Sequence, residues 1–493
     1  AVNGKKSTTG SPIVANDTHL TYRLPNLWYE IQLITPNQNV YGVSIPGAPG
    51  VTLGFNNNIS WAVTNATADT FDWYRVNGEV VKHHKYEINV RDQGVLKEKF
   101  GQSSLGNVVY EKSDDRVLTD SLVRGFALKW AAQEASNELG VFLKLNRSQN
   151  YAECTDSLKN YESPSQNFIC ADRFGKMGII HTGKIPVKKL GQGSYVMNES
   201  LDAWKKFIPF LELPRSENPK LNFVFSANQN PTTKDYPNYL GNEYYSNFRA
   251  REISENLTKA KAVSPQDMMN LQNDVHGILP RELRDRLISA IGTPQPQFEF
   301  AYQTLKSWDL SYPTNSLGAS IFWTWFKLFE ESIWKNKLGD KKNFEWPEPE
   351  TLVYFMLHNS KSDWFDDLDQ QIKVAFEQAC LNLIEKYGSD VQNWKWGHVR
   401  PTNFPHNSKI PGFSRDNLTV WGVEFTLFSN KGYHGPVYKA VVALGEKPSG
   451  WMILPGGPSG NPFSQNYTSN MNDWSVGNFR KVEYFESVSE IPK

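Results

Sequence analysis

Short runs that alternate between apolar and polar residues fill the first 110 residues of the chain. The runs 40–45, 51–55 and 59–64 are separated by Pro46-Gly47-Ala48-Pro49-Gly50 and by Asn56-Asn57-Asn58. A period of two, with turn residues between the runs, predicts β-strands that follow one another closely. We therefore expect the N-terminal part of the chain to build a sheet.

Helical periodicity follows this β-rich part. Leu122, Phe126, Trp130 and further apolar residues at helical spacing predict a helix from about 120 to 145. From about 247 to 387 the pattern is mostly helical, and Ser264-Pro265 supplies a capping hydroxyl with proline at the first helical position.

Strand patterns return at 168–171 and 177–181, and again in the last hundred residues at 420–426 and 437–444. Strands at both ends of a chain around a helical middle indicate one sheet system that distant segments close. We therefore predict a single domain over residues 1–493, with a helical insertion at roughly 247–387.

Composition excludes several classes of function. The 52 basic and 52 acidic residues cancel, so no strong field attracts nucleic acid or an anionic membrane. No apolar run approaches the roughly 18 residues that a membrane span requires. Three cysteines allow at most one disulfide and exclude a zinc site built on thiolates. We expect a protein without a membrane span, a nucleic-acid partner or an organic cofactor.

Four stretches together resemble one family. They are Gly-Ser-Pro-Ile-Val-Ala-Asn-Asp-Thr-His-Leu at 10–20, the Pro-Gly-rich and Trp-Ala-Val-Thr-Asn segments within 45–69, Ser-Ala-Asn-Gln-Asn with the later Arg-Ala-Arg within 226–251, and Pro-Gly-Gly-Pro-Ser-Gly-Asn-Pro with Trp474 within 455–477. Their order and spacing resemble the β chain of the penicillin acylase family of N-terminal-nucleophile hydrolases. The resemblance implies an α+β fold, a four-layered αββα sandwich with a helical middle region.

The resemblance also implies a mechanism and a partner. Family members cleave amides with an N-terminal Ser whose own α-amine acts as the base, which suits an amine with a pKa near 8. That N-terminus is created by autoproteolysis of a precursor, which leaves a shorter α chain bound. The register places Ala1 four residues after the expected Ser, and alanine has no hydroxyl. Either the Ser precedes Ala1, or the protein is a catalytically dead relative that binds small molecules.

The remaining catalytic positions carry over one by one. Asn65 matches the residue whose backbone N–H is one oxyanion donor, and Asn230 matches the Asn whose side chain is the other, with Asn228 as a competitor. His19 matches a Gln or His beside the nucleophile, and Arg251 aligns with an Arg that holds the loop around that Asn. Without the resemblance, the histidine would be read as a turn or core residue, the asparagines as turn caps and the arginine as a solvated side chain.

The acyl group has its own candidate residues. Leu20, Leu53 and Val63 fall where a penicillin G acylase lines its aromatic pocket, and Phe142 lies opposite. They could equally be core residues of alternating strands. If they line a pocket, its mostly aliphatic wall favours an acyl chain over a phenylacetyl group.

A structural calcium ion is the one cofactor that the resemblance implies. Asp69, Asp72 and the Phe71 carbonyl would be ligands, because hard cations prefer oxygen. A further family ligand, an Asp, falls near Leu240, and on residue type alone Asp69 and Asp72 read as exposed turn residues.

The sequence thus predicts an amidohydrolase for amides of apolar acyl groups, such as β-lactam side chains or acyl-homoserine lactones. The resemblance places such a protein in the periplasm or outside the cell.

Overall fold

Two antiparallel sheets form the centre of the molecule. The computed structural model describes residues 1–76, 82–108, 126–198, 203–340 and 345–492. The larger sheet has the strand order β13-β12-β11-β5-β4-β3-β2 and the smaller one β1-β16-β17-β18. The strands of the larger sheet are β2 (Tyr29–Thr35), β3 (Gln38–Ser44), β4 (Leu53–Asn56), β5 (Ile59–Asn65), β11 (Gln166–Asp172), β12 (Met177–Thr182) and β13 (Arg215–Glu217), and those of the smaller sheet are β1 (Ile13–Thr21), β16 (His434–Ala443), β17 (Ser449–Ile453) and β18 (Arg480–Lys481).

The two sheets pack face to face, and their facing side chains form one core. Val43 and Phe55 of the larger sheet share this core with Tyr438 and Val442 of β16. Because β1 pairs with β16 along its whole length, residues from the two ends of the chain lie side by side. The predicted strands at 40–64 and 437–444 therefore belong to one sheet system, as the sequence indicated.

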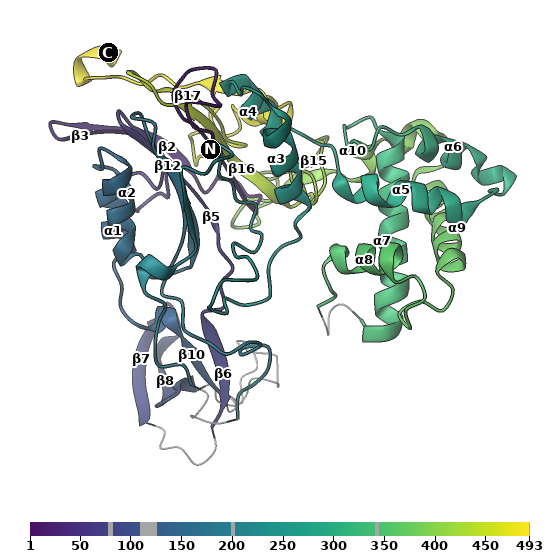
Figure 1. The fold of residues 1–493 in the computed structure, drawn as a ribbon, viewed down its shortest axis with the longest axis horizontal. Helices are drawn as coiled ribbons and strands as arrows, with labels where there is room; N and C mark the ends of the chain where they lie inside the picture. The colour runs from purple at the N-terminus through teal and green to yellow at the C-terminus, as the bar shows by residue number, and fades with distance from the viewer. Residues whose placement is uncertain (77–81, 109–125, 199–202, 341–344, 493) are drawn as a thin grey trace.

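Helices cover both outer faces (Figure 1). On the larger sheet lie α1 (Glu138–Leu145) and α2 (Tyr151–Ser157), which bury Val141 against Trp61. On the smaller sheet lie α3 (Phe248–Lys259) and α4 (Pro265–Gln272), which bury Met268 against Val441. Helix α4 begins with the predicted cap, because the Ser264 side chain accepts a hydrogen bond from the Asp267 N–H. The predicted four-layered αββα sandwich is confirmed.

A second helical body stands beside the sandwich (Figure 1). It contains α5 (Ile278–Ile291), α6 (Glu299–Ser307), α7 (Leu317–Leu338), α8 (Pro349–His358) and α9 (Leu368–Tyr387). Its core surrounds α7, whose Trp325, Phe329 and Trp334 are completely buried. Within the described ranges, every helix is too short or too polar to cross a bilayer. Two short helices, α10 (Trp396–Val399) and α11 (Met471–Ser475), lie in the C-terminal part.

Two segments differ from their predicted structures. Residues 126–130 form a strand, β10 (Phe126–Trp130), which pairs with β6 (Phe71–Arg75) instead of continuing a helix, and Leu122 lies outside the described residues. The spacing of Phe126 and Trp130 fits either period, and pairing with β6 decides for the strand. The remaining strands of this five-stranded sheet are β7 (Lys82–Val90), β8 (Gly94–Ser103) and β9 (Gly106–Val108).

The segment 420–426 is the second difference, because it forms a loop instead of a strand. The Thr426 hydroxyl accepts the Val423 N–H at 3.0 Å and donates to the Phe428 carbonyl, so polar groups of the loop are satisfied locally. The nearby strand pair is β14 (Thr402–Phe404) with β15 (Arg415–Leu418).

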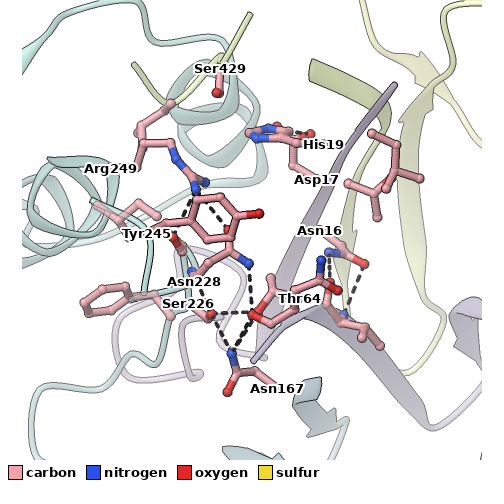
Figure 2. A pocket seen from close by; sticks show the side chains of 18 of the residues that line it. Asn16, Asp17, His19, Thr64, Asn167, Ser226, Asn228, Tyr245, Arg249 and Ser429 are labelled. Atoms are coloured by element: carbon pink, nitrogen blue, oxygen red, sulfur yellow. Dashed lines mark hydrogen bonds and ion pairs between the residues drawn. The ribbon is translucent and has the colours of Figure 1, made fainter. Parts of the chain in front are cut away.

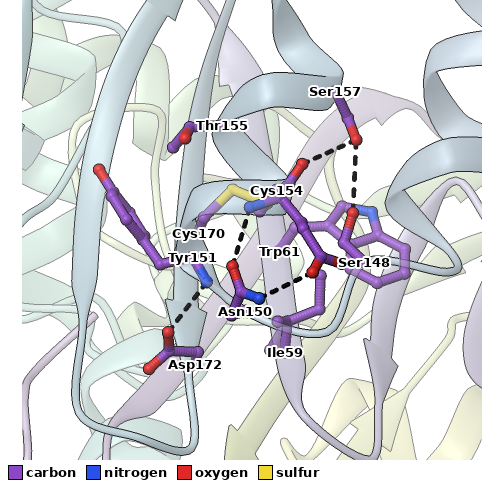
Figure 3. The surroundings of a disulfide bond; sticks show 12 residues. Ile59, Trp61, Ser148, Asn150, Tyr151, Cys154, Thr155, Ser157, Cys170 and Asp172 are labelled. Atoms are coloured by element: carbon purple, nitrogen blue, oxygen red, sulfur yellow. Dashed lines mark hydrogen bonds between the residues drawn. A yellow bond between two sulfur atoms is a disulfide. The ribbon is translucent and has the colours of Figure 1, made fainter.

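One disulfide joins two layers of the sandwich. Cys154 on α2 is bonded to Cys170 on β11, the strand next to β5 (Figure 3). The Asp172 carboxylate also accepts the N–H of Tyr151 at the start of α2. The third cysteine, Cys380, is a buried free thiol on α9.

Candidate active site

A cavity of about 800 Å³ opens where the two sheets meet α3 and the 424–434 loop. The side chains of its wall come from distant parts of the chain (Figure 2). Those used below are Ala1, Asp17, His19, Leu20, Leu53, Val63, Asn65, Phe142, Asn167, Ser226, Asn228, Arg249, Lys431 and His434.

Ala1 lies in the wall of this cavity and is almost completely buried. Its amino nitrogen donates to the Val224 carbonyl at 2.8 Å, and Val2 bridges to both Ile13 and Phe223. The start of the described chain is therefore fixed between β1 and the segment that precedes Asn228.

Asn65 is the last residue of β5, and its N–H faces away from β11. The next N–H, of Ala66, donates to the Ser165 carbonyl at 3.2 Å, and successive N–H groups of a strand alternate in direction. On the side that Asn65 faces, the Asn16 side chain accepts the N–H of Val63, two residues earlier on the same strand. The Asn65 N–H thus lies on the strand edge beside the cavity.

Asn228 brings a second donor to this edge. Its side-chain Nδ2 donates to the Asn65 carbonyl at 2.9 Å. Its Oδ1 accepts from Arg249 Nη2 at 2.9 Å (Figure 2). Its φ of 68° lies in the left-handed region, which asparagine tolerates better than most residues. An amide nitrogen carries two protons, so one remains for a ligand.

The structure does not bring Asn230 to the cavity wall. Its side chain is exposed, and its Oδ1 accepts from the N–H and hydroxyl of Thr232, which closes a local turn. Asn228, the alternative in the sequence, is the asparagine of the two that lines the cavity. The sequence motif alone could not separate two asparagines that are two residues apart.

Arg251 is likewise directed elsewhere. Its guanidinium pairs with Glu282 of α5, and the side chain is 40 % exposed. Arg249 instead donates to the carbonyl of Ala227 and to Asn228, and burial lowers the pKa of its guanidinium. Residues two apart on a helix point about 200° apart, so only one of these arginines can face the cavity.

A hydrogen-bonded cluster around Asn167 connects the end of β5 with the loop that carries Asn228. Asn167 Nδ2 donates to the hydroxyls of Thr64 and Ser226, both at 3.2 Å, and these hydroxyls are 2.6 Å apart (Figure 2). Its Oδ1 lies 2.9 Å from His181 Nδ1, and burial lowers the pKa of His181 to about 4. Sequence reasoning missed these residues because their partners come from separate strands.

His19 lies on the opposite side of the cavity from this cluster (Figure 2). Its Nε2 is 3.2 Å from Asp17 Oδ1, and the β1–β16 register shifts between Thr18 and His19. Such an irregularity redirects a side chain. Nearby His434 has its pKa lowered to about 4, first by burial and then by the charges of His19, Lys431 and Arg249.

The four residues predicted for the acyl group all line the cavity: Leu20, Leu53, Val63 and Phe142. Leu53 is buried in the core between the sheets, and Phe142 packs edge-on against Tyr161. This part of the wall is apolar, whereas Asp17, His19, Arg249, Lys431 and His434 make another part polar.

The predicted calcium ligands also converge, but on a lysine. Asp69 Oδ1, Asp72 Oδ1 and the Phe71 carbonyl all lie within hydrogen-bond distance of Lys188 Nζ. Across the described residues, no group of three or more His, Cys, Asp or Glu side chains is arranged to hold a metal ion. These residues do not fit a calcium site, because an ammonium group fills the space between the ligands.

Comparison with known proteins identifies the family of this chain. The profile of the penicillin amidase family matches residues 1–489, and the chain belongs to that family. The structure is similar to a thermostable penicillin G acylase from Alcaligenes faecalis, with a TM-score of 0.78 and 17 % identity, over 98 % of this chain and 96 % of the other.

Curated relatives are distant but similar over almost the whole chain. The acyl-homoserine lactone acylase QuiP of Pseudomonas aeruginosa is 23 % identical over 97 % of this chain and 65 % of its own length. The penicillin acylase 2 proenzyme of a Pseudomonas species is 20 % identical over 96 % of this chain and 65 % of its own. The penicillin G acylase of Escherichia coli is 24 % identical over 80 % and 52 %. The chain thus spans about two thirds of the length of its first relatives.

Proposed function

We propose that the mature protein hydrolyses the amide bond between an apolar acyl group and an amine. The observation that carries this proposal is the meeting of three elements in one cavity: the segment ahead of β1 at Ala1, the strand edge at Asn65 and the side chain of Asn228. Family membership supports the reaction class.

The nucleophile in this proposal is a Ser four residues ahead of Ala1. Its α-amine removes the proton of its own hydroxyl, and the hydroxyl oxygen attacks the amide carbonyl. The oxyanion that forms accepts from the Asn65 N–H and from the free Nδ2 proton of Asn228, two donors fixed before the substrate arrives. The same amine then delivers the proton to the leaving nitrogen, and water hydrolyses the resulting ester.

Arg249 is a positioning residue in this scheme. By holding Oδ1 of Asn228, its guanidinium prevents the amide from turning its oxygen toward the oxyanion. The Asn167 cluster holds Ser226 against Thr64, and so keeps the loop that carries Asn228 on the strand that carries Asn65. His19, oriented by Asp17, stands beside the nucleophile.

Substrate choice follows from the two parts of the cavity wall. The aliphatic side chains of Leu20, Leu53 and Val63 favour a medium acyl chain over a phenylacetyl group. The polar part, with Arg249 and Lys431, suits an amine product that carries carbonyl or carboxylate oxygens. Acyl-homoserine lactones and N-acyl amino acids fit both requirements, and β-lactams with aliphatic side chains form a second class.

A shorter α chain from the same precursor would complete the protein. Two features support this: about a third of each relative's own length lies outside the match, and one of the relatives is named a proenzyme. The disulfide between Cys154 and Cys170 supports a periplasmic or secreted location, because such bonds persist in oxidising compartments.

The test is an intact-mass measurement of the native protein together with a substrate panel. We expect a β chain that begins Ser-Asn four residues ahead of Ala1, a second shorter chain, and release of medium acyl groups from homoserine lactone amides. The competing function is that of a small-molecule binding protein with the same cleft. A native chain that begins at Ala1, binds acyl-homoserine lactones and releases no acid from them would establish that competitor.

A further inference from the structure

Lys188 occupies the centre of a cluster of oxygen atoms. Its Nζ lies 2.8 Å from Asp69 Oδ1, 2.8 Å from Asp72 Oδ1 and 2.9 Å from the Phe71 carbonyl. The Lys188 side chain is 1 % exposed, and that of Asp72 is completely buried. An ammonium group has three protons, so each of these oxygens receives one.

The second oxygen of Asp72 is occupied by donors of its own. Oδ2 accepts from Gln192 Nε2 at 3.0 Å and from the Tyr74 hydroxyl at 3.1 Å. The backbone of Gly193 packs directly against Asp69. A Cβ at this glycine would lie 2.1 Å from Asp69 Oδ2, so no larger residue fits there. Asp72 and Lys188 therefore lie inside a hydrogen-bonded ion cluster that reaches solvent only through Asp69, whose side chain is 23 % exposed.

A calcium ion needs about six to eight oxygen ligands at about 2.3–2.6 Å. Three oxygens are present here at the longer distances of an ammonium hydrogen bond, and the cation that they surround is covalently part of the chain. We infer that the Lys188 ammonium is a built-in substitute for a divalent cation in this cluster, so the protein holds its fold without calcium.

The cluster links two segments that contribute to the candidate active site: the one that follows β5 and the one that carries Asn228. Asp69 follows Asn65 by four residues, and its N–H donates to the Leu240 carbonyl at 2.8 Å. Lys188 forms a backbone bridge with Tyr239, downstream of Asn228 on the same irregular segment. The charge cluster thus connects the segment that follows β5 with the irregular segment that carries Asn228.

The native protein gives the first test, independent of activity. The mature protein, with any chain that accompanies it, is desalted, analysed for metals and melted with excess EDTA or with 10 mM calcium chloride. We expect no stoichiometric calcium and melting temperatures equal within 1 °C. One calcium ion per molecule, or a melting temperature that EDTA lowers, overturns the inference.

A pair of variants gives the second test. Lys188→Met keeps the length of the side chain and leaves the buried Asp72 carboxylate and the partly exposed Asp69 carboxylate without a counter-charge, which is destabilising. We expect a melting temperature lower by about 5 °C or more, given the size of the protein, and partial recovery on adding calcium but not sodium at equal ionic strength. The control, Lys206→Met, removes an exposed lysine from the segment paired with Val187 and should change neither quantity.

The outcome of the variant melts decides between a cation cluster and an ordinary contact. Calcium-dependent recovery in Lys188→Met alone supports the substitution of an ion by the lysine. Equal melting temperatures for Lys188→Met and parent protein, or a variant that calcium leaves unchanged, overturns it. If the variant is recovered only when calcium is present throughout expression and purification, that result also supports the inference.

Discussion

Asn228 offers the sharpest test of the proposed reaction, and glycine is the replacement that the backbone recommends. The φ of 68° strains an alanine at this position but not a glycine, so Asn228→Gly removes the side chain without adding backbone strain. Arg249 loses one acceptor and keeps its bond to the Ala227 carbonyl at 3.1 Å. We therefore expect a folded variant that lacks the Nδ2 donor and the Oδ1 acceptor of Arg249.

The loss of that donor should appear in kcat. Removing one oxyanion donor costs about 10²–10³ in kcat, which is roughly 2.7–4 kcal/mol of transition-state stabilisation. KM should change little, because the hydrogen bond strengthens mainly as negative charge develops on the oxygen. The assay is steady-state release of an acyl group from a medium-chain homoserine lactone amide, with circular dichroism to confirm folding.

Asn230→Gly is the matched control, since the same residue type is removed two positions away. Among the described residues, its side chain forms hydrogen bonds only with Thr232. We therefore expect kcat within about threefold of the parent. If Asn230→Gly loses as much kcat as Asn228→Gly, or if Asn228→Gly retains the parent value, the assignment of the donor is refuted.

Three further outcomes are expected. Arg249→Lys should lower kcat by about tenfold with a smaller effect on KM, because a lysine cannot bond both the Ala227 carbonyl and Asn228 in the same fork geometry; an unchanged kcat would show that Asn228 needs no such support. His181 has its folded pKa lowered to about 4, so its contribution to stability is complete above pH 6.5 and is lost as pH falls toward 4. The loss at pH 5 is about 2 kcal/mol, and His181→Gln should make the free energy of unfolding, measured in urea at pH 7 and pH 5, less dependent on pH by that amount; an equal dependence in both proteins would contradict the assignment. Replacing Cys154 and Cys170 together by Ser should cost about 3 kcal/mol of unfolding free energy, whereas Cys380→Ser in the same assay removes no crosslink; equal urea midpoints for the double variant and the parent would contradict that estimate.

The sequence by itself determined the fold class and the reaction class of this protein. The runs 40–45, 51–55 and 59–64 alternate between apolar and polar residues, and such a run buries its apolar side chains on one face if it forms a strand. This relation is local, because it does not depend on where the strand lies in the fold. The cap at Ser264 is equally local, because the hydroxyl and the N–H that it accepts are three residues apart. The resemblance of the motifs to the family then predicted the αββα arrangement of these elements.

Only the tertiary structure decided which of two similar neighbours lines the cavity. Asn228 and Asn230, like Arg249 and Arg251, are equivalent in composition and differ in which way the backbone directs them. The same holds for the expected calcium site. The spacing of Asp69 and Asp72 predicted a bound cation, but the cation between them is the Lys188 ammonium, which comes from a segment more than a hundred residues away. Long-range contacts of this kind leave no periodic signal, because they depend on how the sheets pack and not on spacing along the chain.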